Sequence, residues 1–481
     1  MNPHTLCSFF SSFTYLCPMD FTDTICAPAS QPGGAISLVR LSGSESYPIL
    51  AGMINFTGEK KKLAELTPNT IHFAEIHENN EVLDEVMISL FKAPRSYTGE
   101  DMIEISCHGS AYIQNRIVEL LIKNGARIAR PGEFTQRAFL NGKMDLSQAE
   151  AVADLIASES AAQHRVAINQ MRGGFSEELK KMRARLLHLV SMIELELDFS
   201  EEEVEFASRD ELRMLVSELL SYVNRLKDSF QLGNVLKMGI PVAIVGKPNV
   251  GKSTLLNRLL MDDKAIVSEI EGTTRDSIED TIIIDGVRFR FIDTAGIRET
   301  ADFIENLGIR RTYQKIEQSE IILLLADASD NPGSILATYR EIQKQIKHKE
   351  KKLILAINKS DHLSKVALNT IKQSLKEINP LIISAQQDQD MHPVIQELLR
   401  SANLSKLKET DQVITNARHF EVLERSSLSL KRVIEGIDSG LTEDLLSQDI
   451  RECLHYLGEI TGEVTTDEIL GNIFRNFCIG K

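Results

Sequence analysis

The chain has 481 residues, more than one hydrophobic core usually organises, so its length predicts several domains. Its 54 Lys and Arg against 69 Asp and Glu give a formal net charge of −15, which argues against a protein that grips nucleic acid over its whole surface. The sequence lacks an apolar run long enough to span a membrane, and its six scattered cysteines, without a Cys-x-x-Cys pair, indicate reduced thiols. We therefore expect a multidomain cytoplasmic protein.

The first stretch, residues 1–18, is apolar and rich in serine and contains no Lys or Arg. A signal peptide would begin with basic residues. We therefore interpret this stretch as a disordered tail or as the result of a mis-assigned start, with Met19 as the first residue.

Residues 19–139 alternate between short predicted strands and one amphipathic helix. The strands are expected at 34–41, 101–107 and 127–130, and the helix at 111–124. This alternation predicts a compact α+β domain.

Helical periodicity dominates residues 140–236 and returns at 404–481. Apolar residues recur at nearly heptad spacing from Phe175 to Leu197 and again from Leu212 to Leu226, which predicts a long antiparallel helix pair. We interpret the two ranges as halves of one helical domain, into which a different domain, 237–403, is inserted.

The inserted segment opens with a phosphate-binding pattern. The buried strand expected at Ile240–Val245 is followed by Gly246-Lys-Pro-Asn-Val-Gly-Lys-Ser253, and helical spacing begins at Thr254. The glycines let successive N–H groups face a phosphate, Lys252 supplies a cation, and the Ser253 hydroxyl can ligate Mg²⁺. A single match of this kind can arise by chance, but three further motifs follow in the expected order.

Those motifs predict that the nucleotide is GTP. Asp293-Thr-Ala-Gly296 ends one predicted strand and would hold Mg²⁺ through water. Asn358-Lys-Ser-Asp361 ends another, and Ser384-Ala385 follows a third. Asp361 can accept hydrogen bonds from N1–H and the 2-amino group of guanine, which adenine lacks, and Asn358 can donate to the acceptor edge of the ring.

Glu271-Gly-Thr-Thr-Arg-Asp276 has the composition of a switch segment, in which Thr274 would reach Mg²⁺ only when the γ-phosphate is present. The alternative is that its two threonines merely cap a turn. Ile297 follows the Asp293 motif, so the Gln of Ras-like enzymes is missing, and hydrolysis needs another water-positioning group and another positive charge. The predicted GTP-binding residues are Asn249, Val250, Gly251, Lys252, Ser253, Thr254, Ser268, Glu269, Ile270, Glu271, Gly272, Thr273, Thr274, Asp293, Thr294, Ala295, Gly296, Asn358, Lys359, Asp361, Ser384 and Ala385.

Motifs on both sides of the inserted segment resemble one family. They are Thr98-Gly-Glu-Asp101, Arg130-Pro-Gly-Glu-Phe134, Arg137-Ala-Phe-Leu-Asn141, Asp145-Leu-Ser-Gln-Ala-Glu150, Gly272-Thr-Thr-Arg-Asp276 and Phe477-Cys-Ile-Gly-Lys481. Nearly everything after residue 19 resembles the MnmE (TrmE) family of bacterial tRNA-modification GTPases. The resemblance implies a multidomain α/β and α fold: an α+β folate-binding and dimerisation domain, a helical domain with long antiparallel helices, and an inserted P-loop Ras-like G domain.

The resemblance also implies partners and cofactors. It implies a homodimer that binds 5-formyl- or 5,10-methylene-tetrahydrofolate at positions matching Arg40, Glu104, Lys143 and Lys481. Cations suit a glutamate tail and a carboxylate suits a pterin edge, although each residue singly is more often an ordinary surface charge. In a heterotetramer with the flavoprotein MnmG, which supplies FAD and NADH, the family adds a carboxymethylaminomethyl-type group to C5 of the wobble uridine 34 of certain tRNAs. The loop Ser30-Gln-Pro-Gly-Gly34 departs from the expected Gly-Arg-Gly-Gly.

Three further roles rest on the resemblance. A K⁺ ion would be held by Asn249 together with Ser268, Ile270 and Thr273 when two G domains pair, and would replace the positive charge of an arginine finger. Glu305 matches a water-orienting glutamate, although by sequence alone it is one acidic residue on a helix. Cys478 is either an active-site thiol able to attack uridine or a small buried residue that lines the folate or tRNA cavity.

Two other classes of GTPase share the nucleotide motifs. A ribosome-assembly GTPase of the Era or EngA kind would need an RNA-binding module such as a Gly-x-x-Gly loop, and nothing after residue 402 resembles one. A dynamin-like or septin-like GTPase would not explain Arg130-Pro-Gly-Glu-Phe134 or the Cys-Ile-Gly-Lys ending. Absence of folate binding would favour either of these classes.

Overall fold

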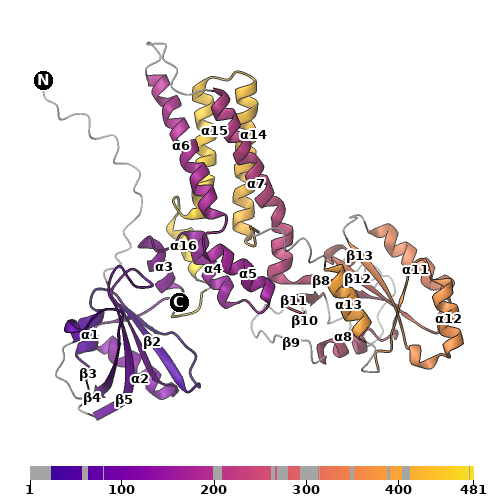
Figure 1. Ribbon diagram of the computed structural model, residues 1–481, viewed down its shortest axis with the longest axis horizontal. Helices are drawn as coiled ribbons and strands as arrows, with labels where there is room; N and C mark the ends of the chain where they lie inside the picture. Colours follow the sequence, from indigo (N-terminus) through magenta and orange to yellow (C-terminus); the bar gives the residue numbers. More distant parts are fainter. Residues whose placement is uncertain are drawn as a thin grey trace. The chain divides into compact units, whose positions relative to one another are not determined.

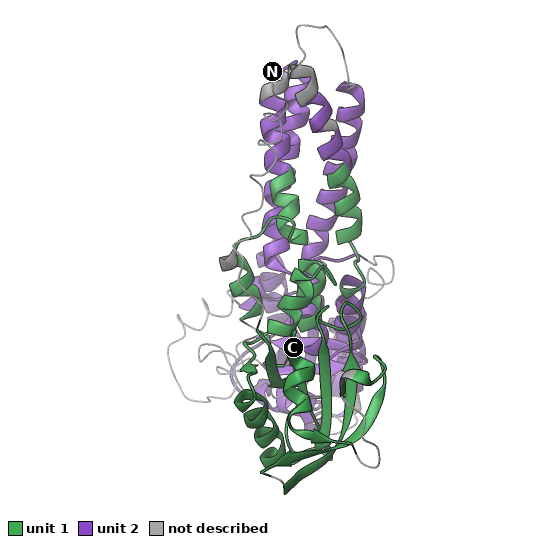
Figure 2. Ribbon diagram, turned by 90° about the vertical axis from the view of Figure 1, so that its left-hand side faces the viewer, with its two compact units in different colours: residues 1–153, 171–184, 454–481 green, residues 154–170, 185–453 purple. Residues whose placement is uncertain are grey.

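The computed structural model (Figure 1) describes residues 23–56, 63–79, 81–198, 209–261, 266–267, 280–292, 313, 315–346, 351–386, 391–402, 412–475 and 477–480. The chain divides into two compact units (Figure 2): Met1–Ala153 with Met171–Ala184 and Leu454–Lys481, and Asp154–Gln170 with Arg185–Cys453. Within the described ranges, no helix is both long enough and apolar enough to cross a membrane. The predicted tail at 1–18 lies outside these ranges, and the predicted domain boundaries stay predictions.

The first unit is built on a sheet that, in the described part of the chain, has seven strands in the order β3-β4-β5-β6-β2-β1-β7. Neighbouring strands are antiparallel, except β1 and β7, which are parallel. Alternate side chains of β6, such as Ile103 and Ile105, are fully buried, so the sheet has one core face. The strands are β1 (Ile25–Pro28), β2 (Ile36–Ser42), β3 (Ile54–Asn55), β4 (Ile71–Glu78), β5 (Glu81–Phe91), β6 (Met102–His108) and β7 (Arg127–Ile128).

Two helices, α1 (Ser46–Ala51) and α2 (Ala111–Lys123), cover the core face of this sheet, and a short 3₁₀ helix between β3 and β4, Leu63–Glu65, also contributes to the core. The opposite face carries exposed apolar side chains. Phe73 of β4 and Met87 of β5 are register partners there and are 46% and 43% exposed. This face of the sheet is therefore partly apolar.

In the second unit, the long helices α7 (Arg209–Met238) and α14 (Ala417–Asp438) pack along each other. Phe230 stacks on Phe420 with ring centroids 4.6 Å apart, Ser427 Oγ donates to Asn224 Oδ1 at 2.9 Å, and Arg213 pairs with Asp438. These contacts run in opposite directions along the two helices, so the pair is antiparallel. Further helices, in chain order, are α3 (Glu133–Leu140), α4 (Leu146–Ile156), α5 (Ala161–Met171), α6 (Ser176–Asp198), α15 (Glu443–Thr461) and α16 (Asp467–Phe474) (Figure 1).

The predicted contact between α6 and α7 is present, but α7 also has a second long partner, α14. The sequence predicts that the helices on either side of the acidic segment at 201–203 form the antiparallel pair. Arg185 of α6 and Glu218 of α7 do contact each other at 3.2 Å, but α7 packs more extensively against α14. The stripe of α14 is as regular as that of α6, so periodicity alone could not choose between the two partners.

The second unit contains another sheet, with seven strands among the described residues in the order β14-β13-β12-β8-β11-β10-β9. The strands β14, β13, β12, β8 and β11 are parallel to one another. Strand β10 is antiparallel to both of its neighbours, β11 and β9. Helices α8 and α13 pack on one face, and α11 and α12 on the other. The elements are β8 (Ile240–Val245), α8 (Lys252–Met261), β9 (Ile266–Val267), β10 (Asp280–Ile284), β11 (Val287–Phe291), β12 (Ile321–Asp327), α11 (Pro332–Gln345), β13 (Lys352–Asn358), a 3₁₀ turn (Ser360–His362), α12 (Lys365–Ser374), β14 (Leu381–Ile382) and α13 (His392–Ser401). The predicted fold class, with its α+β, helical and P-loop α/β parts, is confirmed.

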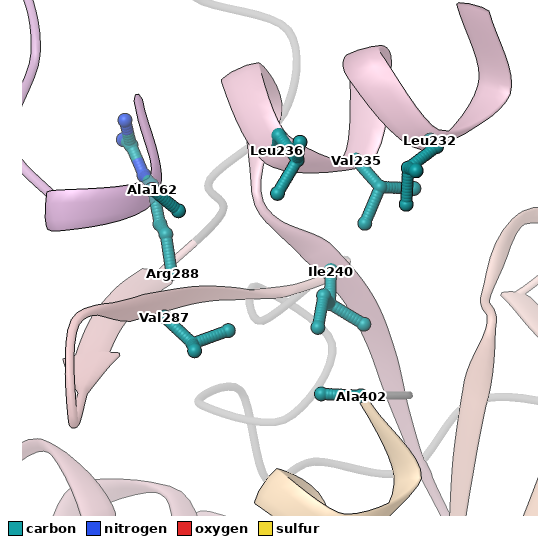
Figure 3. Close-up of a pocket in the computed structure, with 8 residues that line it drawn as sticks. All are labelled: Ala162, Leu232, Val235, Leu236, Ile240, Val287, Arg288 and Ala402. Atoms are coloured by element: carbon teal, nitrogen blue, oxygen red, sulfur yellow. The ribbon is translucent and has the colours of Figure 1, made fainter. Parts of the chain in front are cut away.

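A small apolar pocket lies where α7 runs into β8 (Figure 3), between side chains of the last turns of α7 and those of the β10–β11 hairpin and the end of α13. Polar contacts surround it: Arg288 Nη1 lies 3.3 Å from Glu159 Oε2, and Lys237 Nζ lies 2.8 Å from Asp154 Oδ1. Gln163 also donates to the Lys237 carbonyl at 2.6 Å. These contacts fix the end of α7, and with it the start of the strand that leads to the P-loop.

Candidate functional site

The P-loop follows β8 at the edge of the sheet where the parallel strands β8, β12, β13 and β14 end. Both glycines of the loop are required by close packing. A Cβ added at Gly246 would lie 2.3 Å from the Leu325 carbonyl oxygen, and one at Gly251 would lie 2.4 Å from Asn358 Nδ2. Asn249 between them has a φ of +62°, a left-handed conformation that asparagine tolerates. The loop is therefore a tight cradle of backbone.

Lys252 is the first residue of α8, and its ammonium group lies against the loop. Its Nζ donates to the carbonyl oxygens of Gly246 and Lys247 at 2.8 and 2.7 Å. Burial, and secondarily the positive charge of Lys315, lower the pKa of Lys252. A bound anion would offset both effects, so this position favours a negatively charged ligand. Ser253 and Thr254 follow in the first turn of α8, whose N-terminal end carries partial positive charge.

Asn358 joins the P-loop to the other loops at this edge of the sheet. Its side chain is only 2% exposed. Its Nδ2 donates to the Val250 carbonyl at 2.8 Å, and its Oδ1 accepts from the Ala385 amide at 2.9 Å. The sequence predicts that Asn358 donates a hydrogen bond to the base. The structure shows that one amide hydrogen and the amide oxygen instead hold the protein loops together, which leaves one hydrogen for a ligand.

Asp361 lies one turn beyond the end of β13 and is braced by Ser384. The Ser384 hydroxyl donates to Asp361 Oδ1 at 2.7 Å, and this hydrogen bond lowers the pKa of Asp361. The carboxylate is therefore ionised at neutral pH and accepts hydrogen bonds only. Ser384 and Ala385, predicted to belong to one site with Asn358 and Asp361, do lie together with them.

Two carboxylates outside the predicted site residues, Asp327 and Asp330, also lie at this edge. Asp327, the last residue of β12, lies 2.7 Å from Lys359 Nζ, and Asp330 accepts from Lys247 Nζ at 3.2 Å. Lys359 has a left-handed backbone with a φ of +63°. An acidic residue at the end of an apolar run, Ile321–Asp327, is the same pattern that selected the Asp293 motif, and it could have identified Asp327.

Many predicted site residues lie outside the described residues, and their roles stay predictions. Among the residues that the structure describes, no cluster of His, Cys, Asp and Glu side chains is arranged to hold a metal ion. The undescribed site residues are Ser268, Glu269, Ile270, Glu271, Gly272, Thr273, Thr274, Asp293, Thr294, Ala295, Gly296, Glu305 and Lys481.

The first unit brings two of the predicted folate residues together. Arg40 on β2 and Glu104 on β6 are register partners, and Arg40 Nε donates to Glu104 Oε1 at 2.7 Å. The pair is partly buried, with side chains 14% and 20% exposed, and the guanidinium of Arg40 lies 5.6 Å from the centre of the Tyr97 ring. The result is a cation and a carboxylate side by side on the sheet face away from the helices.

The C-terminal tail reaches the same place. Arg40 Nη1 donates to the Gly480 carbonyl at 3.1 Å. Gly480 has a φ of +91°, and a Cβ there would lie 2.0 Å from the Pro28 carbonyl oxygen, so glycine is required. Cys478 is exposed, and its carbonyl accepts from the Gly132 amide at 3.4 Å. Cys478 is therefore not buried in this structure, and its role in the site stays a prediction.

Lys143 and the loop at Ser30–Gly34 flank this region. Lys143 Nζ donates to the Pro94 carbonyl at 2.8 Å. In this structure, its ammonium group therefore has a different partner from the ion pair of Arg40 and Glu104. The loop, whose sequence departs from the family pattern, is fastened by a hydrogen bond from the Gly33 amide to the Gly109 carbonyl at 3.0 Å. A Cβ at Gly109 would lie 1.7 Å from the Gly34 carbonyl oxygen, so the two glycine-containing segments approach as closely as backbones can.

Charged residues of the Arg130 and Arg137 motifs form a network of ion pairs in the first unit. Arg137 is 1% exposed, and its Nη2 lies 2.6 Å from Asp23 Oδ1 and 3.2 Å from Glu133 Oε1. Its Nη1 lies 3.2 Å from Glu100 Oε1. Arg127 also pairs with Glu133, at 2.6 Å. The motif residues thus join Asp23, Glu100 and α3 within the first unit.

Comparisons with known proteins agree with this arrangement. The family described as "GTP-binding protein TrmE N-terminus" matches residues 24–143, and "MnmE helical domain" matches residues 146–478. The "tRNA modification GTPase MnmE" of Bacteroides fragilis is 53% identical over 464 residues, which cover 95% of this chain and 99% of that protein. The protein of the same name from Christiangramia forsetii is 50% identical over 476 residues, covering 96% of this chain and all of its own length. With matches of this identity over nearly its whole length, the chain belongs to the MnmE (TrmE) family of tRNA-modification GTPases.

Proposed function

We propose that this chain hydrolyses GTP at the edge of the second unit's sheet and uses the reaction to drive tRNA modification. The observation that carries the proposal is the Asn358 side chain, which joins the P-loop at Val250 to the loop at Ala385. That link ties the P-loop to the loops around Asp361, the residue that we propose recognises guanine. A GTPase needs both groups around a single nucleotide.

The residues of the P-loop fit a Mg²⁺-bound nucleoside triphosphate. The donor set is suitable, because backbone N–H groups and Lys252 would bind phosphate oxygens while the Ser253 hydroxyl, with Thr274, would ligate Mg²⁺. When bound, Mg²⁺ neutralises charge on the phosphates. Lys252 is already partly desolvated, so its charge acts on the phosphates in a region of low dielectric constant.

We further propose that hydrolysis depends on K⁺ and on pairing of two G domains. Asn249, in its left-handed position within the P-loop, offers oxygen ligands of the kind K⁺ prefers, with Ser268, Ile270 and Thr273 as the other predicted ligands. K⁺ would supply the positive charge that an arginine finger supplies elsewhere. Glu305 is the predicted residue that orients the attacking water.

The K⁺ proposal is tested by measuring GTP hydrolysis in KCl and in NaCl at equal ionic strength. We expect at least about tenfold faster hydrolysis in K⁺, a modest part of the ~10³–10⁵ attributed to a positive finger. The Asn249→Ala variant should lose this difference. Asn379→Ala is the matched control, because Asn379 is also left-handed, with a φ of +49°, but it precedes β14, whereas the P-loop follows the end of the parallel strand β8. Equal rates in both salts would exclude the K⁺ mechanism.

For the first unit we propose a folate one-carbon donor, 5-formyl- or 5,10-methylene-tetrahydrofolate. The support is the chemistry of the donor set: a carboxylate, Glu104, beside a cation, Arg40, next to the Gly480 backbone. Lys143 and Lys481 would add cations for the glutamate tail. When bound, the folate supplies the one-carbon unit, and the chain's own residues hold and orient it.

The folate proposal predicts that Glu104→Gln weakens binding of 5-formyl-tetrahydrofolate. The change removes the charge from hydrogen bonds that are each worth about 1.5–3 kcal/mol, so we expect a loss of roughly 10- to 100-fold. Titration calorimetry on the full chain measures it directly. Glu75→Gln, a change of the same kind on β4 of the same sheet, should leave the affinity unchanged. Equal affinities in all three proteins would argue against a folate site here.

The reaction we propose for the whole assembly is addition of a carboxymethylaminomethyl-type group to C5 of uridine 34 in certain tRNAs. A flavoprotein partner, MnmG, would supply FAD and NADH in a heterotetramer with a homodimer of this chain. The exposed apolar side chains of the first sheet, including Phe73 and Met87, support self-association of this unit. Cys478 is exposed at the C-terminal tail and is our candidate for a residue close to the uridine.

A further inference from the structure

We infer that Asp327 is a positioning residue for guanine-nucleotide binding, acting through the ammonium group of Lys359. The inference rests on the proposed GTP site and adds a residue to it. Asp327 ends β12 and is the register partner of Asn358 on β13. It therefore lies next to the strand end from which Asn358, Lys359 and Asp361 project.

The carboxylate of Asp327 is held on both oxygens. Its Oδ2 lies 2.7 Å from Lys359 Nζ. Its Oδ1 accepts from the Ser329 amide at 2.9 Å and from the Ser329 hydroxyl at 2.8 Å. Burial alone would raise the pKa of Asp327, but Lys359 and the two Ser329 donors outweigh it and hold the pKa at about 2. The carboxylate of Asp327 is therefore ionised at neutral pH.

The contact with Asp327 fixes the position of the Lys359 ammonium group. Its backbone is fixed by the left-handed φ of +63° immediately after β13, and its side chain is 36% exposed. A lysine side chain so exposed would ordinarily sample many rotamers and would lose that freedom when a nucleotide packs on it. Because Asp327 already holds the ammonium group, less freedom remains to be lost on binding.

The strand pairing makes the contact rigid. The Ala328 amide donates to the Asn358 carbonyl at 2.9 Å, so the segment after β12 is tied to the strand that carries the guanine-recognising residues. Asp327 and Lys359 are therefore held at both ends of their contact by the sheet. Movement of one strand end relative to the other would break it.

Asp330 is a natural control within the same loop. It is three residues further on and accepts from Lys247 Nζ at 3.2 Å, an exposed contact to a different lysine. Asp330→Asn makes the same change in charge as Asp327→Asn. Loss of one negative charge from the loop should therefore affect nucleotide binding equally in the two variants. Only Asp327→Asn should also act through Lys359.

The test is a double-mutant cycle on the full chain, with the Kd of a fluorescent GDP analogue as the readout. Asp327→Asn keeps an oxygen for Ser329 but removes the charge that holds Lys359, and we expect its Kd to rise about tenfold. Lys359→Met keeps a straight apolar chain without the ammonium group. In that background, adding Asp327→Asn should raise Kd less than about twofold, whereas Asp330→Asn should have the same effect in both backgrounds.

With GTP as substrate, Asp327→Asn should raise KM about tenfold and change kcat less than about twofold, because preorganisation for binding acts equally on ground and transition states. An unchanged Kd for Asp327→Asn, or the same loss in the presence and absence of the Lys359 ammonium group, would overturn the inference. The wild-type chain is titrated first. If the wild-type chain failed to bind GDP, both the proposed GTP site and this inference would be wrong. If it binds GDP and the variants behave differently from our expectation, only the role of Asp327 is wrong.

Discussion

An Asp361→Asn variant is expected to lose GTP affinity by about 10³-fold and to gain the ability to bind xanthosine triphosphate. In the proposed site, the ionised carboxylate of Asp361 would accept two hydrogen bonds from guanine, and each such charge-assisted bond is worth about 1.5–3 kcal/mol. The asparagine amide would place a donor against the 2-amino group of guanine. Xanthine has a carbonyl at that position, so the same amide would pair with it. Competition of each triphosphate with a fluorescent GDP analogue measures both effects.

The neighbouring serine provides the control for this exchange of specificity. Ser384 donates to Asp361 Oδ1 at 2.7 Å but has no group that would distinguish guanine from xanthine in our proposal. Ser384→Ala should therefore weaken GTP binding by only a few fold, within the usual ~0.5–1.5 kcal/mol of one hydrogen bond, and should not improve binding of xanthosine triphosphate. If Asp361→Asn kept the wild-type preference for GTP, Asp361 would not be the base-recognising residue.

The second large effect is expected in stability, from the buried charge network of the first unit. In Arg137→Met, the carboxylate of Glu133 would lose one of its cations while remaining fully buried. Asp23 would keep only Arg127, and Glu100 would lose its ion pair with Arg137. Removing one partner from a buried ion network costs about 3–5 kcal/mol. Hydrogen exchange of the β2 and β6 amides, followed against urea concentration, reports the unfolding free energy of this unit in the full chain.

Arg116→Met is the matched control, because Arg116 also pairs with two carboxylates, Glu78 and Glu119, but its side chain is 38% exposed. Exposed pairs of this kind contribute about 1 kcal/mol or less. Similar losses in the two variants would show that burial of the Arg137 network does not matter.

The same network predicts how stability depends on pH. Burial would raise the pKa of Glu133, but Arg127, the Arg130 amide and Arg137 together lower it below its usual value. A folded-state pKa below the unfolded value stabilises the protein above the unfolded pKa of about 4.5, and the stabilisation is lost as pH falls through the folded value. The wild-type unit should therefore lose stability on acidification below about pH 4.5, and Arg137→Met should lose less over the same range.

The part of the fold that was easiest to predict is the parallel sheet. Its strands are buried on both faces and appear as uninterrupted apolar runs, so the predicted strand Ile240–Val245 coincides with β8. The β4–β5 hairpin of the first sheet was not predicted. One face of each strand is open and carries charged residues such as Glu75 and Glu85, while the buried positions include a residue as small as Ala74. Alternation of that kind is easily taken for a polar segment.

For the candidate site, residue types were predictable and their hydrogen-bond partners were not. The residue type shows that Asn358 can donate and accept hydrogen bonds. Its partners, Val250 and Ala385, are distant in sequence, and they reach Asn358 only because three loops come together in the fold. The same holds for Arg40 and Glu104, each of which could be a surface charge until the register of β2 and β6 sets them opposite each other. Pairing across strands depends on topology, which a motif does not contain.

The hydrogen bond from Arg40 to Gly480 has a consequence for biosynthesis. The two residues are separated by 440 positions, so Arg40 leaves the ribosome long before its partner exists. At a synthesis rate of about 5–20 residues per second, the delay is roughly 20–90 s. During that time the first sheet can form, because its strands all lie before residue 129. The place where Arg40, Glu104 and the tail meet is therefore the last part of the unit to be completed, and only a chain translated through Gly480 can complete it.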